Sequence, residues 1–442
     1  HKPITRQQGY FIKGKFDQFN RNVPLSAFVQ ALRGLIGQVL SESDQQLSHW
    51  RQQILAAVGT DGQVLIDVIP ELESIIGPQP PTSKLTGTAA QNRFNELFRA
   101  FVAVFTTAEH PLVMFLDDLQ WADITSLQMV KLLMKDRGHL LLLGAYRDNE
   151  VFPAHPFIQT VDELIKDNAT VNTITLQPLQ QQQINQMAAD TLGCTITVSQ
   201  PLSELIYQKT QGNPFFATQF LRRLYKGGQI TFDYDASVWQ CDISSVRSLS
   251  LTDNGVDFMA AQLKQLPTET QTVLKLAACI GAQFDLHTLA VVCEQSPTDT
   301  AAALWKALQE GFVLPVTETY KFFQQQNAGS KEEYISVPYK FLHDRVQQAA
   351  YSLIPEEQQQ NTHLKIGQLL LARSSPAERE EKLFDIANHL NVGKALMTQA
   401  ADRTQLMEIN LAAGKKAKAS TAYGAAIAYL QTGIDLLNDD YW

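Results

Sequence analysis

The sequence predicts an α/β domain followed by all-α structure. In the first part of the chain, short apolar runs alternate with helical stretches, which is typical of a doubly wound, mainly parallel sheet. The run at residues 112–116 is continuously apolar, as expected of a parallel strand that is buried on both faces. Beyond residue 176 the strand signal fades and helical patterns dominate. We therefore expect one parallel-sheet core with helical units behind it.

Local patterns justify each element of the predicted core. A helix over residues 24–40 would place Phe28, Leu32 and Ile36 on one face, at the spacing of helical turns. Prolines at residues 78, 80 and 81 then break the helical pattern, because each proline fixes φ and lacks a backbone donor. In order, the core is expected to contain strands at 10–16, 112–116, 140–145 and 171–176 and helices at 24–40, 92–105, 126–134 and 157–165. A second helical segment, after the first helix, is expected to carry Leu47, Trp50, Ile54 and Val58.

The rest of the chain predicts several helical units. A small helical lid is expected from helices at 182–192, 202–210 and 214–225, followed by two runs, 229–232 and 238–240, that could pair as a hairpin. The following elements have the pattern of a winged helix. They are three helices at 270–279, 286–293 and 300–309, two short β runs at 312–316 and 335–337, and a further helix at 341–353. Small residues recur in the last helices and favour tetratricopeptide-like repeats, at Ala417, Ala422, Ala425 and Ala426.

These patterns divide the chain into five units. The parallel-sheet core is expected at 1–178, the helical lid at 179–228, a linker with the hairpin at 229–265, the winged helix at 266–355 and the helical repeat region at 356–442.

Composition excludes several classes of protein. With 45% hydrophobic and 18% charged residues, the 442-residue chain is too apolar to be disordered. A net charge of -9 argues against a general nucleic-acid binder, which usually has a basic face. The longest aliphatic runs are far short of the ~20 residues that span a bilayer. The four cysteines lie far apart and form no C-x-x-C pair, so we expect neither a disulfide framework nor a zinc site, and a cytoplasmic location.

The clearest chemical signal is the pair Asp117-Asp118 at the end of the apolar run 112–116. In open α/β sheets, ligands bind beyond the carboxyl ends of the strands. Carboxylates there can hold Mg²⁺ on a triphosphate and polarise an attacking water, which is the Walker B pattern. Asp117 is then the expected Mg²⁺ residue and Asp118 the residue that activates water. The alternative is that the two residues simply begin a turn.

Arg147 follows the next predicted strand. A guanidinium at the tip of the strand beside Walker B could reach the γ-phosphate and report whether ATP or ADP is bound. The alternative is a local surface pair with Asp148 or Glu150.

Two further motifs lie in the helical units. Gly212-Asn213-Pro214 forms a turn into a helix, with Pro at a favoured first helical position, and its flat ring could lie against an adenine base. His343 is expected at the start of a helix, where a lone histidine usually has a structural role.

One apparent phosphate-binding loop is rejected. Residues 9–16 nearly match G-x-x-x-x-G-K-[ST], with Lys15 at the Lys position. However, Phe16 has no hydroxyl for Mg²⁺, and the apolar residues before Lys15 read as a strand. No other segment matches, so these 442 residues contain no Walker A motif.

With these motifs identified, the chain resembles the STAND-class, AAA-like ATPase module of bacterial, cyanobacterial-type multi-sensor serine/threonine–histidine kinases. The resemblance covers nearly the whole chain and is carried by residues 115–123, 144–150, 211–216 and 339–351. It implies attached kinase and sensor domains in one chain. It also implies that the Walker A loop and the first, central strand precede residues 1–4 and are absent here, which would leave the strand at 171–176 without its usual neighbour.

The resemblance further implies a switch in which ATP or ADP, with Mg²⁺, gates an output domain. Asp117 would bind the metal, Asp118 would activate the water and Arg147 would contact the γ-phosphate. Gly212 and Pro214 would lie at the adenine. His343 would contact the β-phosphate of ADP. Partners could also bind the helical repeats, and the module could form a nucleotide-dependent oligomer.

Alternative functions remain. One is a non-catalytic interaction scaffold with degenerate nucleotide chemistry; another is the same module in a LuxR-type transcription regulator or a nucleotide cyclase. Direct nucleic-acid binding is not expected, because the candidate recognition segment 300–311 contributes only Lys306 as a base and also carries Glu310.

Overall fold

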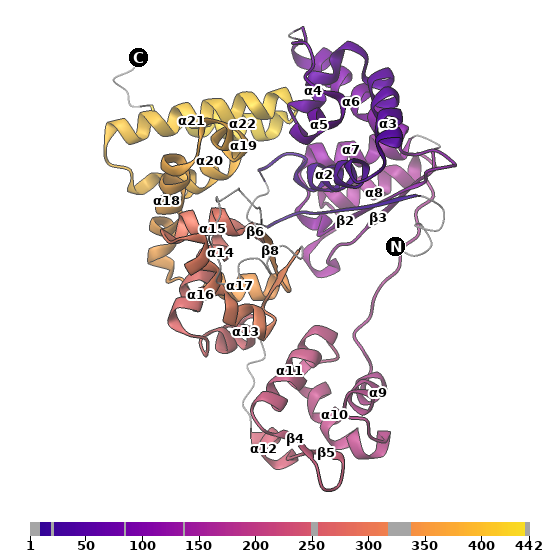
Figure 1. Cartoon of the computed structure of the whole chain (residues 1–442), viewed down its shortest axis with the longest axis vertical. Helices are drawn as coiled ribbons and strands as arrows, with labels where there is room; N and C mark the ends of the chain where they lie inside the picture. The colour runs from indigo at the N-terminus through magenta and orange to yellow at the C-terminus, as the bar shows by residue number, and fades with distance from the viewer. Residues whose placement is uncertain are drawn as a thin grey trace.

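A three-stranded parallel sheet forms the first unit (Figure 1). The computed structural model describes residues 9–18, 22–83, 85–135, 138–248, 255–316 and 337–437. The strand order is β1-β2-β3, and β2 pairs in parallel with both neighbours. The carboxyl ends of the strands therefore meet at one edge of the sheet. The strands are β1 (Tyr10–Lys15), β2 (Leu112–Asp117) and β3 (Leu140–Gly144).

Amphipathic helices pack around this sheet. Helix α2 buries Phe28, Leu32 and Ile36 on its inner face, as the spacing predicts. Phe28 meets Phe98 of α6 edge to face, with 6.0 Å between ring centroids. The helical elements of the core are α2 (Ser26–Leu40), α3 (Asp44–Val58), η1 (Gly59–Asp61), α4 (Gly62–Ile66), η2 (Pro70–Leu72), α5 (Glu73–Ile76), α6 (Gly87–Val104), η3 (Leu119–Trp121), α7 (Ile124–Met134), η4 (Asp148–Glu150) and α8 (Pro156–Lys166).

The predicted strand at 171–176 is wrong. Residues 169–180 have no regular secondary structure, and Ile174 and Leu176 are 84% and 89% exposed. An isolated strand leaves its backbone donors and acceptors without partners. Among the described residues, no strand lies between β3 and this segment to supply those bonds. Alternate residues of β3, Leu141 and Leu143, are also exposed.

A small helical unit follows, at the end of the segment 169–180, which has no regular secondary structure (Figure 1). Its helices enclose a separate apolar core around Ile184, Ile206 and Phe220. The expected hairpin is present, since β4 and β5 pair antiparallel. The elements are α9 (Gln181–Leu192), α10 (Ile196–Thr210), α11 (Pro214–Lys226), β4 (Ile230–Asp233), β5 (Val238–Cys241) and α12 (Ile243–Ser248).

The next unit combines five helices with a three-stranded antiparallel sheet of order β6-β8-β7. Strand β6 was not expected from the sequence. The expected strand at 335–337 falls largely outside the described residues, and β8 begins at Pro338. The elements are α13 (Gly255–Leu263), α14 (Thr268–Ile280), β6 (Gln283–Asp285), α15 (Leu286–Cys293), α16 (Pro297–Glu310), β7 (Val313–Pro315), β8 (Pro338–Phe341) and α17 (Asp344–Ser352).

Small residues allow the C-terminal helices to pack closely. A Cβ added at Gly414 would lie 2.7 Å from Leu430 Cγ, and Ala413, Ala417 and Ala426 are buried nearby. These helices also touch the core, because the Tyr423 hydroxyl donates to the Gly87 carbonyl at 2.8 Å. The elements are α18 (Glu356–Arg373), α19 (Pro376–Glu381), α20 (Leu383–Val392), η6 (Lys394–Leu396), α21 (Ala400–Ala419) and α22 (Tyr423–Asp435).

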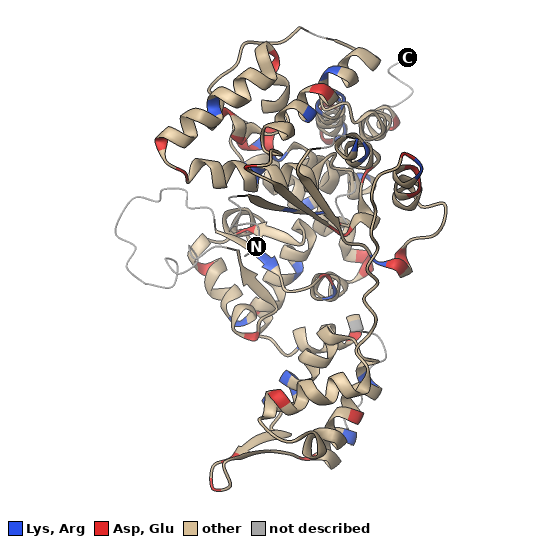
Figure 2. Ribbon diagram, turned by 90° about the vertical axis from the view of Figure 1, so that its right-hand side faces the viewer, with Lys and Arg blue, Asp and Glu red and all other residues tan. Residues whose placement is uncertain are grey.

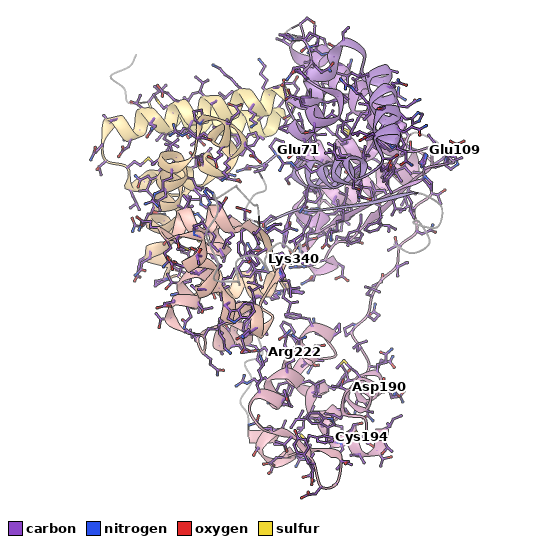
Figure 3. All side chains as sticks on the ribbon, in the orientation of Figure 1. Glu71, Glu109, Asp190, Cys194, Arg222 and Lys340 are labelled. Atoms are coloured by element: carbon purple, nitrogen blue, oxygen red, sulfur yellow. The ribbon has the colours of Figure 1, made fainter. Side chains whose placement is uncertain are left out.

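Charged contacts join the small helical unit to the α13–α17 unit. Arg222 of α11 lies at this junction (Figure 3). The neighbouring Lys226 forms an ion pair with Glu310 of α16, and the Arg223 guanidinium lies over the Phe258 ring at 5.6 Å. Elsewhere, basic and acidic residues are interspersed along the ribbon (Figure 2). Within the described residues, no helix is both long and apolar enough to cross a bilayer.

Two buried histidines meet between α18 and α20. The Nδ1 atoms of His363 and His389 lie 2.8 Å apart, and His363 Nε2 lies 3.1 Å from the Tyr351 hydroxyl. Both imidazoles are 7% exposed. Burial lowers the pKa of His363 to about 4, and burial together with the neighbouring His363 lowers the pKa of His389 to about 3. Both rings are thus neutral at pH 7.

We expect acid to destabilise the chain through this pair. The histidines bind protons below pH 6.5 when unfolded but only near pH 4 or below when folded, so stability falls as the pH drops through this window. Each imidazole contributes a slope of up to about 1.4 kcal/mol per pH unit. Urea unfolding at several pH values should show a shallower slope for His389→Gln than for the wild type. The exposed control His49→Gln should keep the wild-type slope; equal slopes in both variants would contradict the assignment.

Candidate functional site

Two carboxylates mark the end of β2. Asp117 is the last residue of the strand, and one of its carboxylate oxygens accepts a hydrogen bond from the Asp118 N–H at 3.0 Å. Asp118 turns the chain, with a left-handed φ of 55° that Asp tolerates better than most residues. Its side chain is only 6% exposed, against 38% for Asp117. The strand therefore presents one accessible and one buried carboxylate at the sheet edge.

Lys15 reaches both carboxylates from the neighbouring strand. The parallel register places Lys15 of β1 opposite Asp117 of β2. Its Nζ lies 2.6 Å from Asp118 Oδ2 and 3.6 Å from Asp117 Oδ2. Sequence reasoning missed this role because Lys15 belonged to the rejected phosphate-loop match, although β1 is indeed a strand. The available signal was its position at the end of a strand parallel to β2.

Arg147 arrives from the segment after β3. Its guanidinium Nε lies 3.5 Å from Asp118 Oδ1, and its Nη1 lies 2.9 Å from Glu150 Oε1. The guanidinium also lies over the Trp121 ring, 5.0 Å from its centroid. The structure thus shows the local pair with Glu150 that the sequence offered as the alternative, together with a contact to Asp118. The γ-phosphate role of Arg147 stays a prediction.

Gln120 links these groups. Its amide Nε2 donates to Asp118 Oδ1 at 2.8 Å, and its Oε1 accepts from the Arg147 N–H at 3.2 Å. Gln120 is 4% exposed, so both of its amide atoms are satisfied inside the protein. The Gln120 side chain thereby links the end of β2 to the segment that follows β3.

The fourth carboxylate comes from a distant unit. Asp344, the first residue of α17, is 7% exposed. Its Oδ1 lies 2.8 Å from Lys15 Nζ, and its Oδ2 pairs with Arg147 Nη2. Sequence reasoning named the adjacent His343 but missed Asp344, since no local pattern reveals an ion pair with a residue 197 positions away.

Ion pairing decides the charges in this cluster. Burial opposes the charge on Lys15, but the carboxylates of Asp344 and Asp118 outweigh it and raise its pKa. Burial alone would raise the pKa of Asp344, yet Lys15 and Arg147 hold it below its ordinary value. At Asp118, burial prevails over Lys15 and raises the pKa. The two buried carboxylates of the cluster thus differ, because the pKa of Asp118 is shifted up and the pKa of Asp344 is shifted down.

His343 caps α17 and stacks on the small helical unit. Its Nδ1 accepts a hydrogen bond from the Arg345 N–H at 3.1 Å, so in the neutral ring the proton is on Nε2. Its ring stacks on Phe215 of α11, with centroids 4.3 Å apart. Burial lowers the pKa of His343, and although Asp344 opposes this, Arg147 and Lys15 reinforce it. His343 is thus a neutral donor beside the charged cluster.

The turn before α11 has a clear structural role. Gly212 has a φ of 76°, and its carbonyl accepts a hydrogen bond from the Leu179 N–H at 2.8 Å. Asn213 caps the helix by accepting from Phe215 N and Phe216 N. Gly212 is buried, whereas Pro214 is exposed at the first helical position. The fold thus brings this turn near His343 through Phe215, and leaves the Pro214 ring accessible.

The donor set fits Mg²⁺ bound with a nucleotide. Mg²⁺ prefers oxygen ligands and usually takes one or two carboxylates, with water and phosphate oxygens completing its shell. Asp117 is accessible and Asp118 is adjacent, which meets that need. Among the described residues, no cluster of three or more His, Cys, Asp or Glu side chains is arranged to hold a metal by itself. The carboxylates would therefore supply part of the ligand shell.

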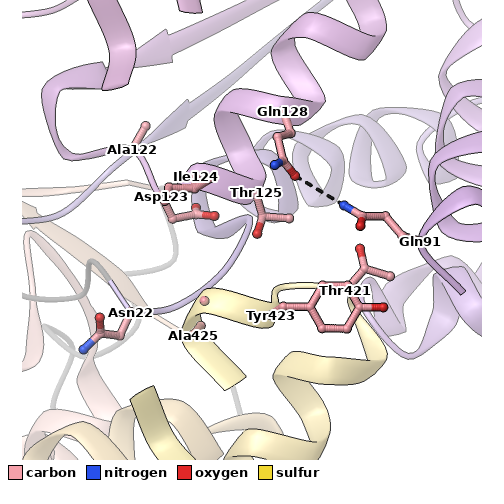
Figure 4. Close-up of a pocket in the computed structure, with 11 residues that line it drawn as sticks. Asn22, Gln91, Ala122, Asp123, Ile124, Thr125, Gln128, Thr421, Tyr423 and Ala425 are labelled. Atoms are coloured by element: carbon pink, nitrogen blue, oxygen red, sulfur yellow. Dashed lines mark hydrogen bonds between the residues drawn. The ribbon is translucent and has the colours of Figure 1, made fainter. Parts of the chain in front are cut away.

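A separate cavity of about 330 Å³ lies where α7 meets α22 (Figure 4). Asp123, Gln128, Thr421 and Tyr423 are among its lining residues. Asp123 caps α7 by accepting from the Ser126 N–H at 3.0 Å. This cavity contains none of Asp117, Asp118 and Arg147, so the charged cluster and the cavity are different sites.

The core is similar to a known class of ATPase. Residues 1–143 match the family described as the AAA ATPase domain. The matched region includes Lys15, Asp117 and Asp118, whereas Arg147 and Asp344 lie beyond it. The first third of the chain, which contains the parallel sheet, is therefore similar to AAA ATPase domains.

The similar full-length proteins are signalling kinases. Hybrid signal transduction histidine kinase G of Dictyostelium discoideum is 29% identical, over 97% of this chain and 15% of that protein. A peroxide stress-activated histidine kinase of Schizosaccharomyces pombe is 22% identical, over 65% of this chain and 13% of that protein. The chain thus spans a small part of the length of either kinase.

A solved structure also aligns with the chain. It is a Signal Transduction ATPase with Numerous Domains (STAND) protein with a tetratricopeptide repeat sensor, from Pyrococcus horikoshii. The alignment covers 98% of this chain and 57% of that protein, with 11% identity and a TM-score of 0.41.

We expect Gly212→Ala to destabilise the chain strongly. The new Cβ would lie 2.1 Å from the Leu179 carbonyl oxygen, in a backbone conformation that L-residues avoid. Gly193→Ala is the matched control, since Gly193 has a similar φ of 57° but no atom within 4 Å of the added carbon. Thermal unfolding should show a loss of about 1 kcal/mol for the control and at least about 3 kcal/mol for Gly212→Ala. Equal losses would show that the close contact is unimportant.

Proposed function

We propose that this chain is a nucleotide-dependent regulatory ATPase module of the STAND class, in a larger signal-transduction kinase. The observation that carries the proposal is the meeting of Lys15, Asp117, Asp118 and Arg147 at the carboxyl ends of three parallel strands. Ligands bind at this edge in open α/β sheets. The similarity to two histidine kinases supports a signalling role.

The residues have distinct proposed roles toward Mg²⁺ and ATP or ADP. Bound Mg²⁺ would neutralise phosphate charge. Asp117, the accessible carboxylate, holds the metal directly or through water, and Asp118 accepts the proton of the attacking water. Arg147 pairs with the γ-phosphate. Pro214 lies against the adenine and Gly212 shapes its turn, while His343 donates from Nε2 to the β-phosphate of ADP.

Nucleotide binding in this proposal also needs a phosphate-binding loop. The resemblance assigns that loop, with a central strand, to sequence ahead of β1. The exposed side chains of Leu141 and Leu143 and the exposed apolar residues of segment 171–176 support this, because an added strand beside β3 would cover apolar surface and pair with both.

The remaining units are proposed to transmit the nucleotide state. We assign the five units to the boundaries 1–178, 179–228, 229–265, 266–355 and 356–442. The unit with β6, β7 and β8 is proposed to be a winged helix, and α18–α22 to be tetratricopeptide-like repeats that bind protein partners. In this scheme the module works in the cytoplasm, is attached to kinase or sensor domains, and can form a nucleotide-dependent oligomer.

Two other functions are less well supported. A non-catalytic scaffold would not need an accessible carboxylate beside a buried one at the end of the strand, which Asp117 and Asp118 provide. A DNA-reading winged helix needs several free basic side chains, yet Lys306 on α16 pairs with Glu310 at 3.1 Å. Tight, salt-sensitive binding of duplex DNA would favour the transcription regulator instead.

We expect Asp118→Asn to abolish most ATP hydrolysis. In a longer chain that includes the phosphate-binding loop, loss of the base should lower kcat by roughly 100-fold or more while ATP still binds. Steady-state phosphate release and calorimetric ATP binding measure the two quantities. Asp148→Asn is the matched control, because Asp148 is exposed and lies one residue from Arg147. Unchanged turnover in Asp118→Asn would refute the role of Asp118.

We expect His343→Ala to weaken ADP retention and to raise basal output. Loss of a charge-assisted hydrogen bond should raise the ADP dissociation constant roughly tenfold. His343→Asn separates this from the helix cap, since Asn also caps helices well. Both variants should release ADP faster, as followed with a fluorescent ADP analogue. Loss of thermal stability in His343→Ala alone, with unchanged ADP affinity, would assign His343 a structural role only.

A further inference from the structure

The segment that leaves β1 forms a contact between the core and the α13–α17 unit. Lys15 Nζ lies 2.8 Å from Asp344 Oδ1 at the start of α17. Two residues later, one carboxylate oxygen of Asp17 accepts a hydrogen bond from the Ala282 N–H at 2.8 Å. Gln18 then accepts from the Gln348 amide at 3.0 Å. Three residues in this short stretch thus hold the α13–α17 unit against the sheet edge.

Lys15 differs from the other two because it also binds the Walker B carboxylate. One ammonium group lies between Asp118, at 2.6 Å, and Asp344, at 2.8 Å. Both carboxylates are almost fully buried, and each would be costly to bury without a cation. Arg147 also pairs with both of them, but it has a further partner in Glu150.

The charges in this cluster do not cancel. Among the described residues, four carboxylates of the cluster form ion pairs with two cations, Lys15 and Arg147, which leaves two negative charges unbalanced. The carboxylates are those of Asp117, Asp118, Glu150 and Asp344. A divalent cation fits this deficit. However, any cation on Asp117 or Asp118 would lie close to the Lys15 ammonium and repel it, because Lys15 already contacts these carboxylates.

We propose that Lys15 is a positioning residue that holds α17 on the core while no nucleotide is bound, and that Mg²⁺ with a nucleotide weakens this contact. Mg²⁺ held by Asp117 would lie close to the Lys15 ammonium and repel it, because Lys15 Nζ is 3.6 Å from Asp117 Oδ2. The nucleotide phosphates would compete with Asp344 for Lys15 and Arg147. Both effects loosen α17. The weakening of the contact by a nucleotide rests on the proposed function, whereas the role of Lys15 in the nucleotide-free chain does not.

The nucleotide-free contact is tested by hydrogen exchange on the 442-residue chain. Lys15→Met should speed exchange of the α17 backbone amides roughly tenfold, and Asp344→Asn should have a similar effect. The double variant should add little to either single variant, because both remove the same contact. Lys15→Arg should restore slow exchange. The matched control is Lys13→Met, since Lys13 is exposed on the same strand and should leave α17 unchanged.

The outcomes separate the contact from general folding. If Lys15→Met lowers the melting temperature of the whole chain, Lys15→Arg and the double variant still decide whether charge at this position protects α17. Wild-type exchange of α17 in Lys15→Met, or fully additive effects in the double variant, would overturn the positioning role.

The nucleotide-dependent half is tested in a longer chain that carries the phosphate-binding loop. Adding ATP with Mg²⁺ should speed α17 exchange several-fold, and ATP with a chelator should have a smaller effect. Failure of ATP to bind at all would refute the proposed function and leave the nucleotide-free result standing. Tight binding of ATP and Mg²⁺ without faster α17 exchange would overturn the competition alone.

Discussion

The parallel pairing of β1 with β2 is the constraint on which the charged cluster depends. It places Lys15 beside Asp117 and Asp118, so that a buried carboxylate at the end of β2 has a cation within 2.6 Å. Without that cation, burying Asp118 would be strongly unfavourable. The same ammonium group also pairs with Asp344, so the register of two strands in the core contributes to the contact with α17.

Several residues that follow β2 orient the charged side chains of the cluster. Gln120 joins Asp118 to the backbone of Arg147, while Trp121 lies under the Arg147 guanidinium and donates to Glu150 at 3.1 Å. Asp123 caps α7 and accepts from the Leu25 N–H at 3.2 Å. The segment therefore acts as a support that sets the orientation of one carboxylate and one guanidinium.

The small helical unit is connected to this cluster through one aromatic contact. Phe215, which follows Pro214 on α11, stacks on His343, and His343 precedes Asp344. A change in the position of α17 would thus alter the contact of His343 with Phe215 on α11 as well as the ion pair of Asp344 with Lys15 in the core. The residues proposed to contact a nucleotide therefore lie on different units of the chain. Pro214, proposed to contact the base, belongs to the small helical unit, and His343, proposed to contact a phosphate, belongs to the α13–α17 unit.

The sequence by itself determined the elements whose signals are local. We could predict strand β2 from its apolar run, together with Asp117 and Asp118 at its end and Arg147 after β3. These predictions succeed because the pattern of a strand and its end depends on residues that are neighbours in the sequence. The strand expected at 171–176 failed, since strand formation also needs a hydrogen-bonding partner that local pattern does not supply. Only the tertiary structure revealed Lys15 and Asp344 as site residues. Their ion pair joins positions far apart in the chain, and no local spacing encodes such a contact.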